Sequence, residues 1–243
     1  MEFRRSFCRA LLVIVTGAIS YFGMVGSATA GVIYQAIGAT CTDPIFGIAC
    51  NGPEPLDRSY NQSGLTTNYL SGVDDFDTYI ASNPEHVFSF TGNEWWSGED
   101  PFNGALGPTT PIVLTYDLGI EVNLDAFALW NEDAVGIAGF DLSASSDGSS
   151  YTSLLTNQAP VDNAIDANYG PEVFGFNEIS ARYVRIQMNS CNLWLGKSRC
   201  AVGEVAFRGA GPSTISNSVP EPGSLALLGL GLIGIGLRRK FRQ

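Results

Sequence analysis

The chain has 243 residues and a formal net charge of −11, from 24 acidic side chains against 13 lysines and arginines. Nucleic acids and anionic membranes attract positive surface, so this charge argues against both as partners of the folded part. The length is sufficient for one sizeable core with additional terminal segments.

The first 30 residues have the composition of a secretory leader. Arg4, Arg5 and Arg9 form a positive region, residues 10–19 are apolar, and the small residues 27–30 follow. This order predicts a signal peptide that signal peptidase removes after Ala30. A permanent N-terminal anchor fits less well, because the apolar stretch is short and ends in a small-x-small pattern.

Residues 31–209 are predicted to form one mostly β domain, a sandwich or jelly roll with a single short helix. The helix is expected at 74–81, where apolar residues fall on one side behind acidic first-turn residues. Short segments rich in Val, Ile, Tyr and Phe predict strands at 112–117, 124–130, 140–145, 183–188 and 202–207. Gly119 and Asp147-Gly148 are expected at turns, and Asp117 is expected to pair with Arg182 or Arg185.

Six short phrases follow one another in the second half of the chain: WWS (95–97), YDLG (116–119), ALW (128–130), SSDG (145–148), ARYVRI (181–186) and GEVAF (203–207). This series resembles discoidin-like domains, also called coagulation factor type C or galactose-binding-like domains. The resemblance implies a β-sandwich fold. Each phrase also has a purely structural explanation, so the resemblance supports a fold better than an activity.

The same resemblance implies two kinds of site. A structural calcium ion near the start of such a domain would use the region of Asn93 together with Glu204; alternatively, Glu204 pairs with an arginine. Ligand recognition on loops at one end of the sandwich implies a binding surface made of Trp95, Trp96, Asn131, Asn192, Trp194, Lys197 and Arg199. Alternatively, one of the paired tryptophans belongs to the core and Trp194 caps its loop.

Four cysteines remain once the leader, with Cys8, is removed. An even number in an exported protein predicts disulfides, and three pairings are possible. We favour Cys41–Cys50 and Cys191–Cys200, because each closes a short loop. A metal site is disfavoured by the lack of a CxxC spacing and by the distance in sequence to the single histidine.

No catalytic residue is predicted. His86, the only histidine, is expected on the surface or at a strand edge rather than as a catalytic base. A pair of carboxylates suited to glycoside cleavage remains open, since the sequence does not show their separation.

The C-terminus carries a second segment with the pattern of a processing signal. Residues 210–218 form a polar linker, and the triplet Pro220-Glu221-Pro222 precedes an uncharged run at 224–237 and a basic end that includes Arg238, Arg239 and Lys240. The region 219–243 resembles the PEP-CTERM sorting signal, which implies recognition by an exosortase-type membrane protease. The run is shorter than the roughly 20 residues of a stable transmembrane helix, which favours a transient anchor over a weak permanent one.

Both ends together predict an exported protein of a Gram-negative bacterium. It is expected to be tethered briefly to the inner membrane, and then to reach the cell surface or the extracellular matrix. Without the two ends, six basic residues face 22 acidic ones, a net charge of −16 that is compatible with bound cations. The predicted role is non-enzymatic adhesion or carbohydrate binding, with exopolysaccharide as the partner. A polysaccharide hydrolase and a structural protein without a specific ligand are the alternatives.

Overall fold

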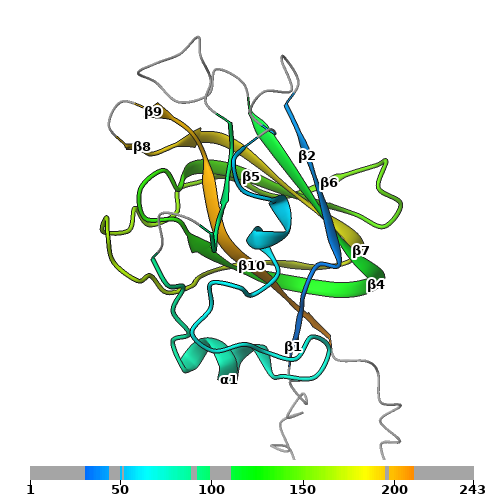
Figure 1. The fold of residues 1–243 in the computed structure, drawn as a ribbon. Helices are drawn as coiled ribbons and strands as arrows, with labels where there is room; N and C mark the ends of the chain where they lie inside the picture. The colour runs from blue at the N-terminus through cyan, green and yellow to red at the C-terminus, as the bar shows by residue number, and fades with distance from the viewer. Residues whose placement is uncertain are drawn as a thin grey trace, which may run out of the picture.

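The computed structural model describes residues 31–43, 50, 52–88, 92–98, 111–194 and 197–210. The predicted leader, the sorting segment and all of the linker except Ala210 lie outside these residues. Figure 1 shows the elements, which in chain order are β1 (Gly31–Tyr34), β2 (Gly38–Thr42), the 3-10 helix η1 (Leu56–Ser59), α1 (Phe76–Ala81), β3 (Trp95–Trp96), β4 (Ile112–Asn131), β5 (Ile137–Ser145), β6 (Thr152–Gln158), β7 (Glu172–Cys191), β8 (Leu193–Trp194), β9 (Lys197–Ser198) and β10 (Ala201–Ala210).

Two long strands, β4 and β7, connect the layers of an antiparallel sandwich. The strand order is β1-β10-β4-β7-β5-β6, with β2 beside β4 and β3 beside β10. Residues 112–117 of β4 pair with β2 and with the second part of β7, whereas residues 124–131 pair with β10. The β4–β7 register breaks between Asp117 and Val122, where Gly119 has a φ of 77°. We call β2, β5, β6 and the adjoining parts of β4 and β7 the first layer, and β1, β3, β10 and the remaining parts the second layer.

The main core lies between the two layers. Alternate side chains of each strand point inward, as the two-residue period of a strand requires. Phe127 packs edge-to-face on Phe140 with ring centroids 5.7 Å apart and stacks on Phe174 at 5.2 Å. The fully buried members of this core include Leu114, Tyr116, Phe127, Leu129, Phe140, Leu142, Val184, Ile186, Val205 and Phe207.

The second layer is also covered on its other face. A second group of apolar side chains points away from the main core. It combines residues of β1, β4 and β10 with residues of α1 and of the segment before α1: Ile33, Ala128, Trp130, Ala206, Leu65, Tyr69, Phe76 and Tyr79. The indole nitrogen of Trp130 donates a hydrogen bond to the carbonyl of Pro84 at 2.7 Å. Because both faces are covered, residues 126–131 and 201–207 are buried at every position.

The predicted helix is confirmed, although it is shorter than expected. It begins at Phe76 because Asp75 is its N-cap, and the Asp75 carboxylate accepts a hydrogen bond from the Thr78 amide at 2.8 Å. Side chains that cap in this way satisfy amides that have no partner within the helix.

All five predicted strands are present, with one correction. The segments 112–117 and 124–130 belong to the single strand β4, because the chain bends at Gly119 without leaving the sheet. The predicted turn at Asp147-Gly148 joins β5 to β6, and Gly148 has a φ of 74° there. Of the two arginines considered, Arg182 pairs with Asp117, through two hydrogen bonds of 2.8 and 2.9 Å.

Both predicted disulfides are confirmed. Cys41 is bonded to Cys50, and Cys191 to Cys200, with Cα–Cα distances of 5.5 and 5.3 Å. Within the described ranges, no helix is long and apolar enough to cross a membrane. The predicted span at 224–237 lies outside those ranges.

Candidate functional site

One end of the sandwich brings the paired tryptophans against the loop that the second disulfide closes. β3 pairs with β10 through Trp96 and Ala201. The Ser97 amide donates to the Cys200 carbonyl at 2.8 Å, and the Cys200 amide donates to the Ser97 hydroxyl at 2.9 Å. Two segments separated by about 100 residues in sequence therefore meet at the loop 191–200.

Two of the residues expected at the ligand surface are buried. Trp95 is 1% exposed and belongs to the main core, as the alternative for one of the two tryptophans stated. Asn131 is 2% exposed, and its amide nitrogen donates to the carbonyls of Ile137 and Val161 at 3.0 and 2.9 Å. Both side chains hold the structure of this end and face no open surface.

The other expected ligand residues lie around the loop. Trp96 is half-buried, and its indole nitrogen donates to Glu94 at 3.1 Å. The Asn192 amide donates to Asp162 at 2.5 Å, and Arg199 is half-buried. Trp194 and Lys197 form a backbone pair in the short β8–β9 ribbon, and their side chains lie outside the described part.

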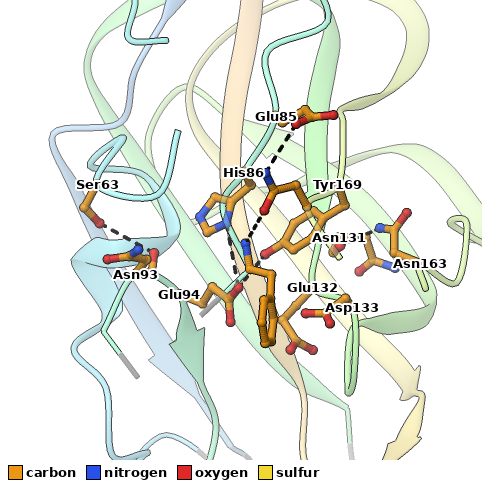
Figure 2. A network of polar contacts seen from close by, with 12 residues as sticks. Ser63, Glu85, His86, Asn93, Glu94, Asn131, Glu132, Asp133, Asn163 and Tyr169 are labelled. Atoms are coloured by element: carbon orange, nitrogen blue, oxygen red, sulfur yellow. Dashed lines mark hydrogen bonds and ion pairs between the residues drawn. The ribbon is translucent and has the colours of Figure 1, made fainter. Parts of the chain in front are cut away.

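Three buried carboxylates gather near this end of the sandwich. Glu94, Glu132 and Asp133 are 1%, 1% and 3% exposed, and each offers a carboxylate oxygen within 4.8 Å of the others. Figure 2 shows them close to His86 and Tyr169. We call these three residues the acidic cluster; it could hold a metal ion.

Backbone amides position the carboxylates that follow β4. One oxygen of Glu132 accepts from the amides of Ala134 and Val135 at 2.9 and 2.5 Å. Asp133 accepts from the amide of Asp166 at 2.7 Å. The turn after β4 therefore holds both side chains in place, and Glu94 joins them from the segment before β3.

Burial makes the acidic cluster electrostatically costly. The pKa of Glu132 is raised to about 8, first because burial disfavours its charged form and then because of the nearby charge of Glu94, although its amide donors act in the opposite direction. Burial also raises the pKa of Asp133. Among the described residues, neither Glu132 nor Asp133 has a lysine or arginine within 4.0 Å. Because their negative charge is not offset by a protein cation there, the carboxyl groups of Glu132 and Asp133 need a proton or a bound cation.

His86 corrects a sequence prediction, because it is fully buried rather than exposed or at an accessible strand edge. Its ring stacks on Tyr169 with centroids 5.1 Å apart, and its Nδ1 lies 3.7 Å from a Glu94 oxygen. The Tyr169 hydroxyl donates to that same oxygen at 2.8 Å (Figure 2). Burial lowers the pKa of His86 to about 4, so the ring is neutral at pH 7 and does not balance the acidic cluster.

The two residues expected to bind calcium do not belong to the acidic cluster. Glu204 is fully buried, and one of its oxygens accepts from the Gln62 amide at 2.6 Å, while burial raises its pKa well above the usual range. Asn93 precedes Glu94, and its carbonyl accepts from the Ser63 hydroxyl at 3.5 Å. The sequence analysis missed Glu132 and Asp133, although two adjacent acids directly after a buried strand are the pattern that marks them.

Two family descriptions match the chain. Residues 82–202 match the F5/8 type C domain, and residues 218–240 match the PEP-CTERM protein-sorting motif. The first covers WWS to ARYVRI, five of the six phrases on which the predicted resemblance rests, and ends just before GEVAF. The second covers the predicted sorting triplet and basic end. Neither match is to a catalytic domain. No curated protein matches the chain.

Several solved structures are similar to this fold. One is the CBM32 of AlyQ in complex with 4,5-unsaturated mannuronic acid, at 18% identity and a TM-score of 0.40 over 72% of this chain and 96% of that one. CBM32-3 from a family 31 glycoside hydrolase of Clostridium perfringens has 18% identity and a TM-score of 0.41, over 73% and 90%. Chitosan-binding module 1 from a chitosanase/glucanase of Paenibacillus sp. IK-5 has 16% identity and a TM-score of 0.42, over 72% and 96%.

Proposed function

We infer that this protein, an F5/8 type C domain followed by a PEP-CTERM sorting motif, is an exported surface protein that binds carbohydrate without cleaving it. The observation that carries the proposal is the meeting of Trp96 with the disulfide-closed loop 191–200 at one end of the sandwich. Loops fixed on a rigid β scaffold are common places for ligand recognition.

The residues of this end have the chemistry that sugar recognition requires. The apolar face of a sugar ring packs on an indole, while its hydroxyls take hydrogen bonds from amide, ammonium and guanidinium groups. Trp194 supplies the indole in this proposal, and Asn192, Lys197 and Arg199 supply the polar groups. Because the disulfide limits the freedom of the loop, less conformational entropy is lost when the ligand binds.

Calcium binding by the acidic cluster is part of the proposal. Carboxylate oxygens are the ligands that calcium prefers, and three of them lie together. In the part of the chain that the structure describes, no cationic side chain lies beside Glu132 or Asp133. A bound calcium ion would offset two of the three carboxylate charges and fix the turn after β4 to the segment before β3. Glu94, Glu132 and Asp133 therefore replace Asn93 and Glu204 as the proposed ligands.

The two ends of the chain set the proposed route. Signal peptidase cuts after Ala30, and the segment 224–237 holds the exported protein briefly in the inner membrane of a Gram-negative bacterium. An exosortase-type protease then acts at Pro220-Glu221-Pro222. The folded domain reaches the cell surface or the extracellular matrix, where exopolysaccharide is the proposed partner.

A binding assay on the full chain tests the carbohydrate proposal. We expect retention on exopolysaccharide recovered from the native host and on a subset of a glycan array. Trp194→Ala should weaken this binding by about tenfold or more, because it removes the stacking surface. Leu193→Ala is the matched control, since Leu193 is the exposed neighbour of Trp194 in the same ribbon and should leave binding unchanged.

Three other outcomes would each replace part of the proposal. Unchanged binding by Trp194→Ala would refute the loop site. No binding to any glycan would favour a purely structural protein, and progressive shortening of the polymer would show a hydrolase. The intact mass of the protein from its native host tests the sorting route, which predicts an N-terminus at Gly31 and loss of the basic tail.

A further inference from the structure

The outer surface of the first layer carries a groove that is separate from the loop site. The groove has a volume of about 500 Å³ and is lined by residues of β2, β4, β7 and the β5–β6 turn. This volume lies within the range of about 300 to 1,000 Å³ typical of small-ligand sites. Figure 1 shows β2, β4 and β7 side by side there, with β8 and β9 at the far end of the sandwich.

Strand register places the polar side chains of the groove in one row. Thr40 of β2 pairs with Thr115 of β4, and Thr115 pairs in turn with Arg185 of β7. Their neighbours Leu114 and Val184 are fully buried in the core, so the row faces outward. The row presents hydroxyl and guanidinium groups across three adjacent strands.

The aromatic part of the groove surrounds the β5–β6 turn. The Arg185 guanidinium carbon lies 3.5 Å from the centroid of the Tyr151 ring. Tyr183 closes the same side, and a side chain at Gly148 would come within 3.2 Å of its ring. The groove therefore combines tyrosine rings with hydrogen-bonding groups, as saccharide sites do.

Among the described residues, the groove contains one cation, Arg185, that forms no ion pair. Both oxygens of Asp117 are bound by Arg182. One oxygen of Asp147 accepts from the Ser145 hydroxyl and from the amides that follow Gly148. Arg185, in contrast, has two interactions with the described residues: the contact with Tyr151 and a hydrogen bond from Nε to the Thr115 hydroxyl at 3.4 Å. Within the described part of the chain, no carboxylate lies within 4.0 Å of its guanidinium.

A second hollow shows the contrasting arrangement. It lies beside Arg208, whose guanidinium is bound by Asp125 at 2.7 and 3.2 Å and by Asp77 at 2.9 Å. That arginine is already satisfied by carboxylates of the protein itself. Arg185 keeps the donors of its two terminal nitrogens available for a carboxylate supplied by a ligand.

We propose that this groove binds a segment of a uronic-acid polysaccharide, with Arg185 receiving the sugar carboxylate and Tyr151, Tyr183, Thr40 and Thr115 contacting the rings and hydroxyls. The groove adds a second site to the proposed carbohydrate binding. Arg185 lies seven residues before Asn192, which directly follows β7, so the two are about 23 Å apart at roughly 3.3 Å per residue.

The net negative charge of the protein makes this proposal specific. A polyanion gains nothing from the long-range field of a body with 22 acidic and six basic residues. Any binding of an acidic polysaccharide must therefore come from local contacts, and losing the Arg185 guanidinium should remove most of it.

The test measures binding of short oligogalacturonates to the full chain by calorimetry, with the methyl-esterified oligomers as the neutral counterpart. We expect the acid form to bind and the ester to bind about tenfold or more weakly. Arg185→Gln should lose a similar factor for the acid form and little for the ester. Gln187→Ala, two residues along the same strand and outside the groove, should bind both forms as the wild type does.

A second variant and the loop variant complete the test. Thr40→Glu adds a carboxylate on the exposed side of β2 and leaves Arg185 in place. It should weaken binding of the acid form, because the new negative charge repels the sugar carboxylate. Trp194→Ala should leave oligogalacturonate binding unchanged, which separates the groove from the loop site. Absence of binding by the wild type, equal binding of acid and ester, or full binding by Arg185→Gln would each overturn the proposal.

Discussion

The acidic cluster and the groove both contain charged residues, but these residues differ in their burial and in the groups that bind them. In the acidic cluster, Glu132 and Asp133 are buried, and no cationic side chain of the described residues lies beside them. In the groove, Asp117 is bound by Arg182 and Asp147 accepts hydrogen bonds from backbone amides, whereas Arg185 has no carboxylate partner among the described residues. A buried charge without an opposite charge beside it lowers the free energy of unfolding, whereas a charge at the surface has little effect on stability and mainly affects the binding of partners. Changes in the acidic cluster should therefore alter stability, and changes in the groove should alter binding.

The largest contrast is expected between two glycine substitutions. A Cβ at Gly64 would overlap the ring of His86, whereas a Cβ at Gly38, in the groove, would meet nothing within 4 Å. Gly64→Ala should lower the free energy of unfolding by about 3 kcal/mol, because the packed surroundings of His86 cannot yield. Gly38→Ala should change it by less than about 0.5 kcal/mol. Denaturant titration of both variants measures the difference, and equal effects would show that His86 is not tightly packed.

Calcium should stabilise the protein through the acidic cluster. At a calcium concentration about 100 times its Kd, stabilisation of about 2.7 kcal/mol is expected, or a rise of about 5 to 10 °C in the thermal midpoint. Glu132→Gln keeps an oxygen for the amides of Ala134 and Val135 but removes the charge, so it should abolish most of the rise. Thermal unfolding with calcium and with EDTA measures this. A calcium effect of the same size in the variant would place the ion elsewhere.

The pH dependence of the calcium-free protein should follow Glu132. Its pKa is raised from 4.5 to about 8 on folding, so its contribution to stability is present below about pH 4.5 and is lost as the pH rises through 8. His86 acts in the opposite direction: its pKa falls from 6.5 to about 4, and stability is lost as the pH falls through that range. Above pH 6.5 the slope should therefore belong to the buried carboxylates whose pKa burial raises, Glu132 of the acidic cluster and Glu204 outside it.

Unfolding midpoints in EDTA between pH 6.5 and 8.5 check this sign. The wild type should lose stability as the pH rises, and Glu132→Gln should show a flatter profile. A wild-type midpoint that rises with pH in EDTA would mean that the carboxylates are compensated by a group that their described contacts do not include.

The smallest effect on stability is expected for Arg185→Gln. Among the described residues, its guanidinium interacts with the Tyr151 ring and the Thr115 hydroxyl, so its loss should move the thermal midpoint by less than about 2 °C. Circular dichroism during heating is sufficient to detect a larger change. A large loss of stability would mean that Arg185 has a structural role, and that the groove is not free to serve a ligand.

Local sequence patterns were sufficient for much of the fold. Alternating apolar residues marked the strands, Asp75 and the residues after it marked α1, and short cysteine spacing favoured both disulfides. These features depend on neighbours in the chain. The continuation of β4 through Gly119 was not predicted, because a glycine with positive φ usually ends a strand.

The candidate site was less accessible to sequence reasoning, because it depends on contacts between distant segments. His86 looked exposed beside Glu85, yet Gly64, Tyr169 and Glu94 enclose it. Trp95 looked equivalent to Trp96, but only the pairing of β3 with β10 determines which ring enters the core. The sequence marks Glu132 and Asp133 as adjacent acids after a buried strand, but Glu94 meets them only after the sandwich has formed, so no spacing predicts the full acidic cluster.

Binding of the full chain to exopolysaccharide from its native host, measured in parallel for the wild type, Trp194→Ala and Leu193→Ala, tests the central claim most directly. Carbohydrate binding at the loop end predicts retention of the wild type and of Leu193→Ala, with the affinity of Trp194→Ala reduced by about tenfold or more. Equal affinity of all three proteins would contradict the loop site, and failure of a folded wild type to bind any polysaccharide would contradict the proposed function itself.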